Sequence, residues 1–167
     1  MRKRSRLSPG KQSLLMVIGC GGLLAVVWLA TLVVPSPPRP LLEEAVAKIE
    51  GHFDRIEESI AAGSIIERSE EVAEQACPIE ERGAQARVQR VLDVDPDLDR
   101  VAWAAALGGT FPEADGWVVR VRTLDSRANL GIRIVGRDLT IINITATDAS
   151  GEARITLRST SECSRSA

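Results

Sequence analysis

Three acidic side chains are the groups of this sequence best suited to catalysis. Glu113, Asp115 and Asp125 fall on predicted turns, and two carboxyl groups held close together can hydrolyse a glycoside. The single histidine, His52, is distant from them in the sequence, so no serine–histidine–acid relay and no histidine-containing metal cluster is expected around them. Because any domain of this size carries such acids, we expect a protein that is not an enzyme and holds no cofactor. A membrane-tethered, carboxylate-dependent hydrolase is the alternative.

Four aspartates alternate along one segment, in the pattern that opens an EF-hand calcium loop: Asp93, Asp95, Asp97 and Asp99. The rest of that motif is missing, because Leu98 stands where the loop needs glycine and Ala104 where it needs a bidentate glutamate. A helix start explains the same residues, with Asp95 as N-cap and Pro96 as the first helical residue. No metal site is predicted, and a cation bound by these acids is the alternative.

Five arginines are predicted to project from the outer face of a C-terminal sheet: Arg120, Arg122, Arg133, Arg154 and Arg158. Guanidinium groups bind phosphate and carboxylate through paired hydrogen bonds, so this face could bind phosphate or acidic polymers. Because solvent-facing strand residues have to be polar in any case, we interpret these arginines as a solvated face, with anion binding as the alternative. Residues 83–167 hold eleven acids and eleven bases, so no basic surface is expected and nucleic acid is not an expected partner.

Two of the three cysteines, Cys77 and Cys163, lie outside the apolar N-terminal segment and are expected to form a disulfide. They bracket almost the whole C-terminal part, and closing so long a loop stabilises a fold by about 4–5 kcal/mol in the chain-entropy model. Such a bridge suits a chain with few aromatic residues, whose core must be built from small aliphatic side chains. Two free buried thiols are the alternative.

An uncharged apolar run, residues 13–34, has the length of one membrane-spanning helix. Its 22 residues would rise about 33 Å as a helix, enough to cross a hydrocarbon core of about 30 Å. Residues 1–12 carry five basic and no acidic residues, which predicts a cytoplasmic basic tail and an extracytoplasmic C-terminal part at the plasma membrane. A cleaved signal peptide and lipidation at Cys20 are the alternatives.

A proline-rich spacer, residues 35–40, is predicted to precede a helical stalk over residues 41–76. One apolar stripe of the stalk repeats at helical spacing and ends before Gly63: Leu42, Val46, Ile49, Phe53, Ile56 and Ile60. The stripe can pair two copies as a short coiled coil, giving a homodimer, or pack against another element of the same or a different chain. His52, beside the stripe, is predicted to be a surface residue.

The second half of the stalk is predicted to be a short helix that ends near Ala76. Ser64 and Glu67 have the spacing of a capping box. Four glutamates follow along this segment: Glu67, Glu70, Glu71 and Glu74. We interpret them as a solvated helix face.

Residues 77–167 are predicted to form an α+β domain closed by the disulfide. The segment from Gln85 to Val94 is expected to be a strand, and residues 96–107 a helix that two glycines end. Four further segments alternate apolar and polar residues, which predicts an antiparallel meander. The expected fold class is therefore α+β, with an N-terminal transmembrane helix, a helical stalk, and a small sheet of about five strands packed with one helix.

These features predict a single-pass, membrane-anchored extracytoplasmic protein that acts as a non-catalytic binding or assembly component of the cell envelope. The expected partners are the lipid bilayer and another membrane or envelope protein that contacts the span or the stalk. A structural subunit that dimerises through the stalk helix is a further alternative.

Overall fold

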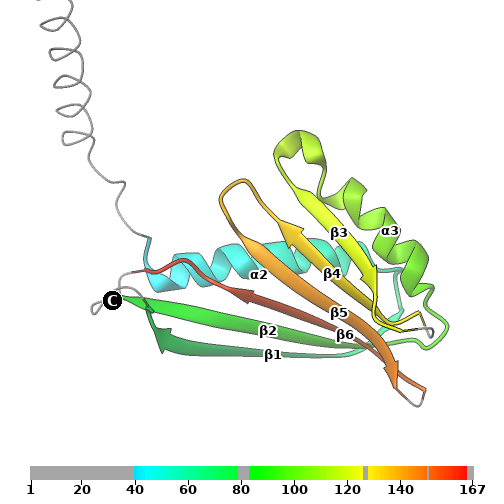
Figure 1. Cartoon of the computed structure of the whole chain (residues 1–167). Coiled ribbons are helices and arrows are strands. Elements are labelled where there is room, and N and C mark those ends of the chain that lie inside the picture. The colour runs from blue at the N-terminus through cyan, green and yellow to red at the C-terminus, as the bar shows by residue number, and fades with distance from the viewer. Residues whose placement is uncertain (1–39, 79–82, 126–127, 150, 165–167) are drawn as a thin grey trace, which may run out of the picture. The chain divides into compact units, whose positions relative to one another are not determined.

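One antiparallel sheet of six strands, with two α-helices packed on one face, makes up most of the described chain (Figure 1). The structure is a computed structural model that describes residues 40–78, 83–125, 128–149 and 151–164. The predicted basic tail and apolar span, and the spacer up to residue 39, lie outside these residues. Within the described ranges, no helix is long and apolar enough to cross a membrane.

Two α-helices, a short 3-10 helix and six strands follow one another along the described chain. Their bounds are α2 (Leu42–Glu58), β1 (Ile65–Ala76), β2 (Ala84–Val94), α3 (Arg100–Thr110), η1 (Glu113–Asp115), β3 (Val118–Thr123), β4 (Leu130–Val135), β5 (Ile141–Ala149) and β6 (Glu152–Thr160). The strand order is β1-β2-β6-β5-β4-β3, and all neighbouring strands are antiparallel. The predicted C-terminal meander and the strand predicted at residues 85–94 are therefore confirmed.

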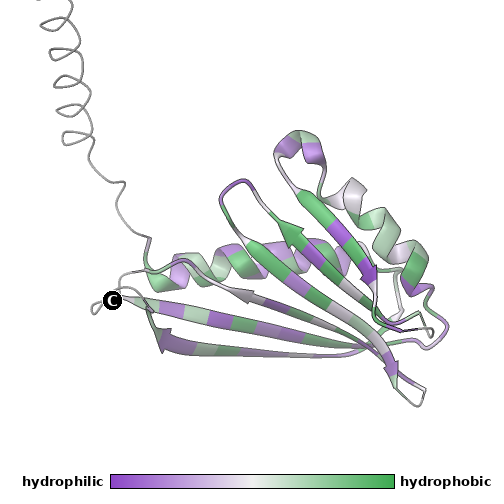
Figure 2. Ribbon diagram, viewed as in Figure 1, coloured by the Kyte–Doolittle hydropathy of each residue, from purple (hydrophilic) through white to green (hydrophobic). Residues whose placement is uncertain are grey.

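The sheet has one buried inner face and one open face, because apolar and polar residues alternate along its strands (Figure 2). On β2, Val88 and Leu92 are fully buried, and the register places them on the same side as Ile155 and Leu157 of β6. Both helices pack on this inner face and complete one core cluster. Its members include Phe53, Ile56, Leu92, Trp103, Leu107, Phe111, Ile134, Ile142, Ile144, Ile155 and Leu157.

Helix α2 lays the predicted apolar stripe on the inner face of the sheet. Four of the six stripe residues are buried in the core: Ile49, Phe53, Ile56 and Ile60. Val46 packs partly against it, and Leu42 is half-buried. Burying one large apolar side chain contributes about 1.5–3 kcal/mol, so the stripe holds α2 firmly on the sheet of its own chain.

The segment after α2 forms a strand and not the predicted second helix. β1 pairs with β2 from Ile65 to Ala76, so the glutamates assigned to a helix lie along an edge strand. Glutamate, alanine, glutamine and arginine favour a helix locally, but pairing with β2 along the whole segment outweighs that preference. An edge strand exposed on both faces also lacks the alternation by which the other strands were predicted.

The predicted fold class is wrong. It placed a helical stalk before about five strands and one helix, whereas the described chain has two α-helices and six strands and is mostly sheet. Both halves of the predicted stalk belong to the sheet domain. The first half, α2, is a helix packed on the sheet, and the second half, β1, is an edge strand. Residues 39–167 accordingly form one compact unit. The transmembrane helix of the prediction has no counterpart among the helices of the described residues.

Helix α3 begins later than predicted, because Asp99 and not Asp95 is its N-cap. The Asp99 carboxylate accepts the N–H of Val101 at 3.1 Å and that of Ala102 at 2.9 Å. Asp95 instead accepts the N–H of Asp97 at 2.9 Å, which makes a local turn. The helix also continues through the two glycines that were predicted to end it.

The predicted disulfide between Cys77 and Cys163 is confirmed. It joins the segments that follow β1 and β6, with the two Cα atoms 5.8 Å apart, an ordinary separation for a disulfide. Gly83 lies against the bridge, because a Cβ at this position would come 2.9 Å from the Cys77 Sγ. The bridge connects cysteines 86 positions apart and closes β2 to β6 into one covalent loop.

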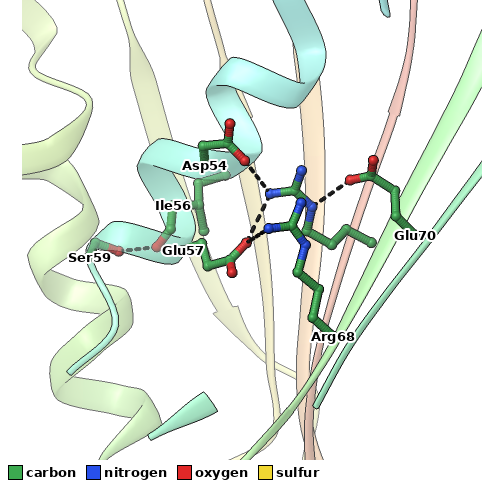
Figure 3. Close-up of polar contacts among 7 residues, drawn as sticks. Asp54, Ile56, Glu57, Ser59, Arg68 and Glu70 are labelled. Carbon is green, nitrogen blue, oxygen red and sulfur yellow. Dashed lines mark hydrogen bonds and ion pairs between the residues drawn. The ribbon is translucent and has the colours of Figure 1, made fainter. Parts of the chain in front are cut away.

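A buried arginine joins α2 to the first two strands. Arg90 lies on the inner face of β2 with 1 % of its surface exposed, among apolar neighbours. Its guanidinium donates to Asp54 at 2.6 Å and Glu57 at 2.9 Å on α2, and to Glu70 at 2.5 Å on β1. Figure 3 shows these three carboxylates converging from the helix and the edge strand. Burial alone would lower the pKa of this arginine, but the carboxylates raise it, so the cation stays charged.

Replacing Arg90 with methionine is expected to lower the free energy of unfolding by about 1–3 kcal/mol. The substitution approximately keeps the volume but removes the cation that neutralises three carboxylates. Arg68→Met is the matched control, because Arg68 lies 3.5 Å from the same Glu57 but is exposed, and its loss should cost less than about 1 kcal/mol. Urea unfolding of both full-length variants measures the difference. Equal losses would contradict the central role of Arg90.

Candidate functional site

The open face of the sheet, opposite the two helices, carries a group of exposed arginines. The strand register confirms that the five arginines predicted to face outward share this side, because they alternate with inner-face residues on β3, β4 and β6. Strand β2 adds a sixth arginine that the sequence analysis did not include. We call these six residues the arginine face: Arg87, Arg120, Arg122, Arg133, Arg154 and Arg158.

A row of polar residues crosses the open face at right angles to the strands. Arg158 of β6 is the Cα partner of Asn143 on β5, which in turn pairs with Arg133 of β4. Arg133 is the partner of Arg120 on β3. Neighbouring strands lie about 4.7–4.9 Å apart, so the three arginines of the row start within about 14 Å of one another. Gln89 of β2 extends the row and accepts a hydrogen bond from Arg158 Nε at 2.7 Å.

The row places like charges opposite each other, which lowers the stability of the sheet. Arg120 and Arg133 are directly opposite each other on β3 and β4, a placement that destabilises strand pairing. Neither makes an ion pair within the described ranges of the chain. On the same face, by contrast, Arg154 binds Asp93 at 2.6 Å. The unneutralised pair leaves guanidinium N–H groups available to an anion.

Two shallow depressions on this face share part of the row. The first has a volume of about 510 Å³ and lies beside Arg120 and Arg122. The second, of about 620 Å³, lies beside Arg158. Arg133 and Asn143 line both depressions, so Arg133 is the centre of the candidate site. Sites for small molecules commonly have volumes of about 300–1,000 Å³.

A glycine lets one more arginine reach the first depression. Arg122 and Gly131 are direct partners on β3 and β4, and a Cβ at position 131 would come 2.9 Å from the Arg122 Nε. The side chain of Arg122 therefore lies across β4 at this glycine. Any larger residue at position 131 would push Arg122 away from the row.

The lining of the two depressions is suited to holding an anion. Arginine remains charged at physiological pH and donates from a planar fork that matches phosphate and carboxylate oxygens. The amide of Asn143 and the hydroxyl of Thr145 add neutral hydrogen-bonding groups to the first depression, and Thr160 adds one to the second. This combination supplies charge, direction and several donors on one surface.

The three acids considered for catalysis are not brought together. Glu113 and Asp115 are exposed on η1, before β3, whereas Asp125 follows the other end of that strand. A strand of six residues spans about 20 Å, more than the separation of about 5–9.5 Å between the carboxyl groups of glycosidases. Asp125 accepts a hydrogen bond from Asn129 at 2.7 Å. The geometry gives the hydrolase alternative no support.

Three of the four alternating aspartates serve local structure. Asp93 binds Arg154, Asp95 makes a turn, and Asp99 caps α3. Across the described ranges, no group of three or more histidine, cysteine or acidic side chains is placed to hold a metal ion.

The predicted surface position of His52 is wrong. The imidazole is half-buried, with its ring centre 5.0 Å from that of Trp117 and 6.5 Å from that of Phe111. Its Nε2 atom is buried and has no hydrogen-bond partner among the residues that the structure describes. Burial lowers the pKa of His52, and the nearby charge of Arg55 lowers it further. The ring therefore packs as a neutral group of α2 against the segment that leads into β3.

An ion pair ties α2 to the turn between β4 and β5. Lys48 Nζ lies 2.5 Å from the Asp138 carboxylate, which also accepts the N–H of Thr140 at 3.2 Å. Burial alone would raise the pKa of Asp138, but these two partners hold it at about 2. The carboxylate is therefore charged at physiological pH.

Sequence reasoning missed Arg87 although a signal for it was present. Gln85, Arg87 and Gln89 alternate with the buried residues Ala86 and Val88, which marks the outer face of a strand. What the sequence did not reveal is that β2 lies next to β6. Only that pairing places Arg87 on the same surface as the other arginines.

A scan against protein-family models finds no match, and a search of curated proteins finds none. Among solved structures, this chain is similar to a DUF4853 family protein from Actinomyces odontolyticus ATCC 17982, with a TM-score of 0.52 and 18% sequence identity. The match covers 79% of this chain and 73% of that chain. At this identity the likeness shows the fold alone.

The stability of the full chain is expected to fall as the pH drops below about 6.5. His52 takes up a proton near that pH when unfolded, but only at a lower pH when folded. Its stabilising contribution is complete above the unfolded pKa and is lost as the pH falls toward the folded pKa. His52→Gln should flatten the dependence of the melting temperature on pH between about pH 7.5 and 5. An unchanged dependence in circular dichroism melts would contradict this assignment.

Proposed function

We propose that this protein binds an anionic ligand on the arginine face, as a non-catalytic component of the cell envelope. The ligand presents phosphate or carboxylate groups, on a small molecule or an acidic polymer. A single membrane span at residues 13–34 tethers the sheet domain outside the cytoplasm. The bilayer and an envelope ligand or protein are the partners in this proposal.

The direct opposition of Arg120 and Arg133 is the observation that carries the proposal. A sheet face that only has to be solvated gains nothing from two guanidinium groups placed against each other. Here the row continues through Asn143 to Arg158 without an acidic side chain. An anion seated over the row would relieve the repulsion and accept several charge-assisted hydrogen bonds, each worth about 1.5–3 kcal/mol.

The location outside the cytoplasm is supported by the sequence and by the disulfide. The apolar run has the length of a membrane span, and the five basic residues before it favour a cytoplasmic N-terminus. The bond between Cys77 and Cys163 is typical of proteins in an oxidising compartment.

In intact cells, a membrane-impermeant maleimide is expected to label Cys77 and Cys163 of the Cys20→Ser chain only after mild reduction. The reason is that both thiols are joined in a disulfide outside the cytoplasm. Protease added to the same cells should remove the sheet domain. Labelling that requires cell lysis, with protection from protease, would contradict the location. Labelling without reductant would show that the disulfide does not form in the cell.

Isothermal titration of the full chain with inorganic tripolyphosphate tests the ligand class. At about 50 mM ionic strength, Arg133→Gln and Arg158→Gln are each expected to weaken binding about tenfold or more. Each substitution removes charge-assisted hydrogen bonds worth about 1.5–3 kcal/mol, and 1.4 kcal/mol corresponds to about tenfold in affinity.

Arg154→Gln is the matched control for this titration. It removes the same charge from the same face, but from an arginine that Asp93 already neutralises. We expect it to weaken binding less than about threefold. Equal weakening by all three variants, or no effect of Arg133→Gln and Arg158→Gln, would rule out a site centred on Arg133.

A further inference from the structure

The two outer strands of the sheet, β1 and β3, each leave one side of their backbone unpaired. In the part of the chain that the structure describes, β1 pairs only with β2 and β3 only with β4. The free N–H and C=O groups of an edge strand can pair with a further strand. Most residues of both strands are exposed.

The two edges carry opposite charges. Strand β1 contains four glutamates and one arginine, whereas β3 contains two arginines and no acid. On the open face, Glu67 and Glu71 project from β1, and Arg120 and Arg122 project from β3. Contact between like edges of two copies would place like charges together, whereas contact between β1 and β3 places opposite charges together.

Each edge also exposes one valine on the inner face. Val72 of β1 is 48% exposed and Val121 of β3 is 45% exposed. Their cross-strand partners, Val88 and Ile132, are both buried in the core, which places both valines on the inner side of the sheet. A contact between these valines would extend the apolar face from one copy to the next.

The strand directions allow the two edges to join in an antiparallel pair. All five neighbouring pairs of the sheet are antiparallel, so β1 and β3, at opposite ends of six strands, run in opposite directions. A second copy beside the first, with its inner face on the same side, therefore presents β1 antiparallel to β3. One register satisfies both contacts: when Arg122 lies opposite Glu71 of the second copy, Val121 lies opposite Val72 of that copy.

We infer that copies of this chain associate head to tail, with β1 of one copy added to β3 of the next in this register. The contact is heterologous, so the assembly either closes into a ring or extends as a filament. It goes beyond the proposed anion binding, because it uses the two edges of the sheet and leaves Arg133 and Arg158 free.

Cysteine cross-linking tests the register in the full chain carrying Cys20→Ser, where Cys77 and Cys163 are already joined. Chains with Val72→Cys are mixed with chains with Val121→Cys in mild detergent and oxidised gently. Directly opposed residues of paired strands have Cα atoms about 4.5–5.5 Å apart, within the range of a disulfide. We expect a covalent dimer in the mixture and none in either variant alone.

The neighbouring position supplies the control for register. Ala73 points to the opposite face of β1 from Val72, so Ala73→Cys chains mixed with Val121→Cys chains should not cross-link. Cross-linking of Val72→Cys chains alone would show that like edges meet and would overturn the proposal. Failure of the Val72→Cys and Val121→Cys mixture to cross-link would overturn it as well.

Charge exchange tests the same pairing without added cysteines. Self-association of the full chain, measured by sedimentation, should weaken about tenfold or more in Arg122→Glu and in Glu71→Lys, because each variant places like charges opposite each other. A chain with both substitutions restores an opposite pair and should regain the association. The proposal would be overturned if the double variant kept the circular dichroism spectrum of the parent chain but did not regain self-association. Glu71→Lys leaves every residue of the arginine face in place, so tripolyphosphate binding by this variant tests the proposed function separately.

Discussion

Arg90 places a positive charge on the inner face of a sheet whose neighbouring side chains are apolar, and three carboxylates neutralise it. Two of the carboxylates come from α2 and one from β1, so the helix, the edge strand β1 and its neighbour β2 are joined at one point. A charge so deeply buried costs several kcal/mol when it loses its partners. The apolar stripe of α2 supplies attraction to the sheet, and Arg90 determines where along the sheet the helix lies.

Most of the elements predicted correctly from the sequence have one buried face. Strand β2 and the four C-terminal strands alternate with a period of two, and α2 shows a helical stripe, because burial leaves a periodic pattern. Strand β1 leaves no such pattern, since it lies at an edge with both faces exposed, and its residues favour a helix until β2 pairs with them. Glu70 shows the difference, because it was read as a solvated helix residue and in fact binds a buried cation.

The candidate site was predictable in composition but not in arrangement. Alternation along the strands identified arginines on an outer face, and this needed no knowledge of which strands are neighbours. The transverse row needs that knowledge, because Arg158, Asn143 and Arg133 come from three strands whose register only the fold determines. His52 was misjudged for a similar reason, since Trp117 reaches it from a segment distant in the sequence.

The place of β6 in the sheet determines when the domain can fold. This last strand lies between β2 and β5, so the hairpin of β1 and β2 and the meander of β3 to β5 have no direct strand contact with each other until it arrives. Until residues 152–160 are in place, the edges of β2 and β5 that β6 covers stay unpaired. Residues that pair across a large sequence separation, such as Arg87 and Thr160, close long loops and therefore slow folding.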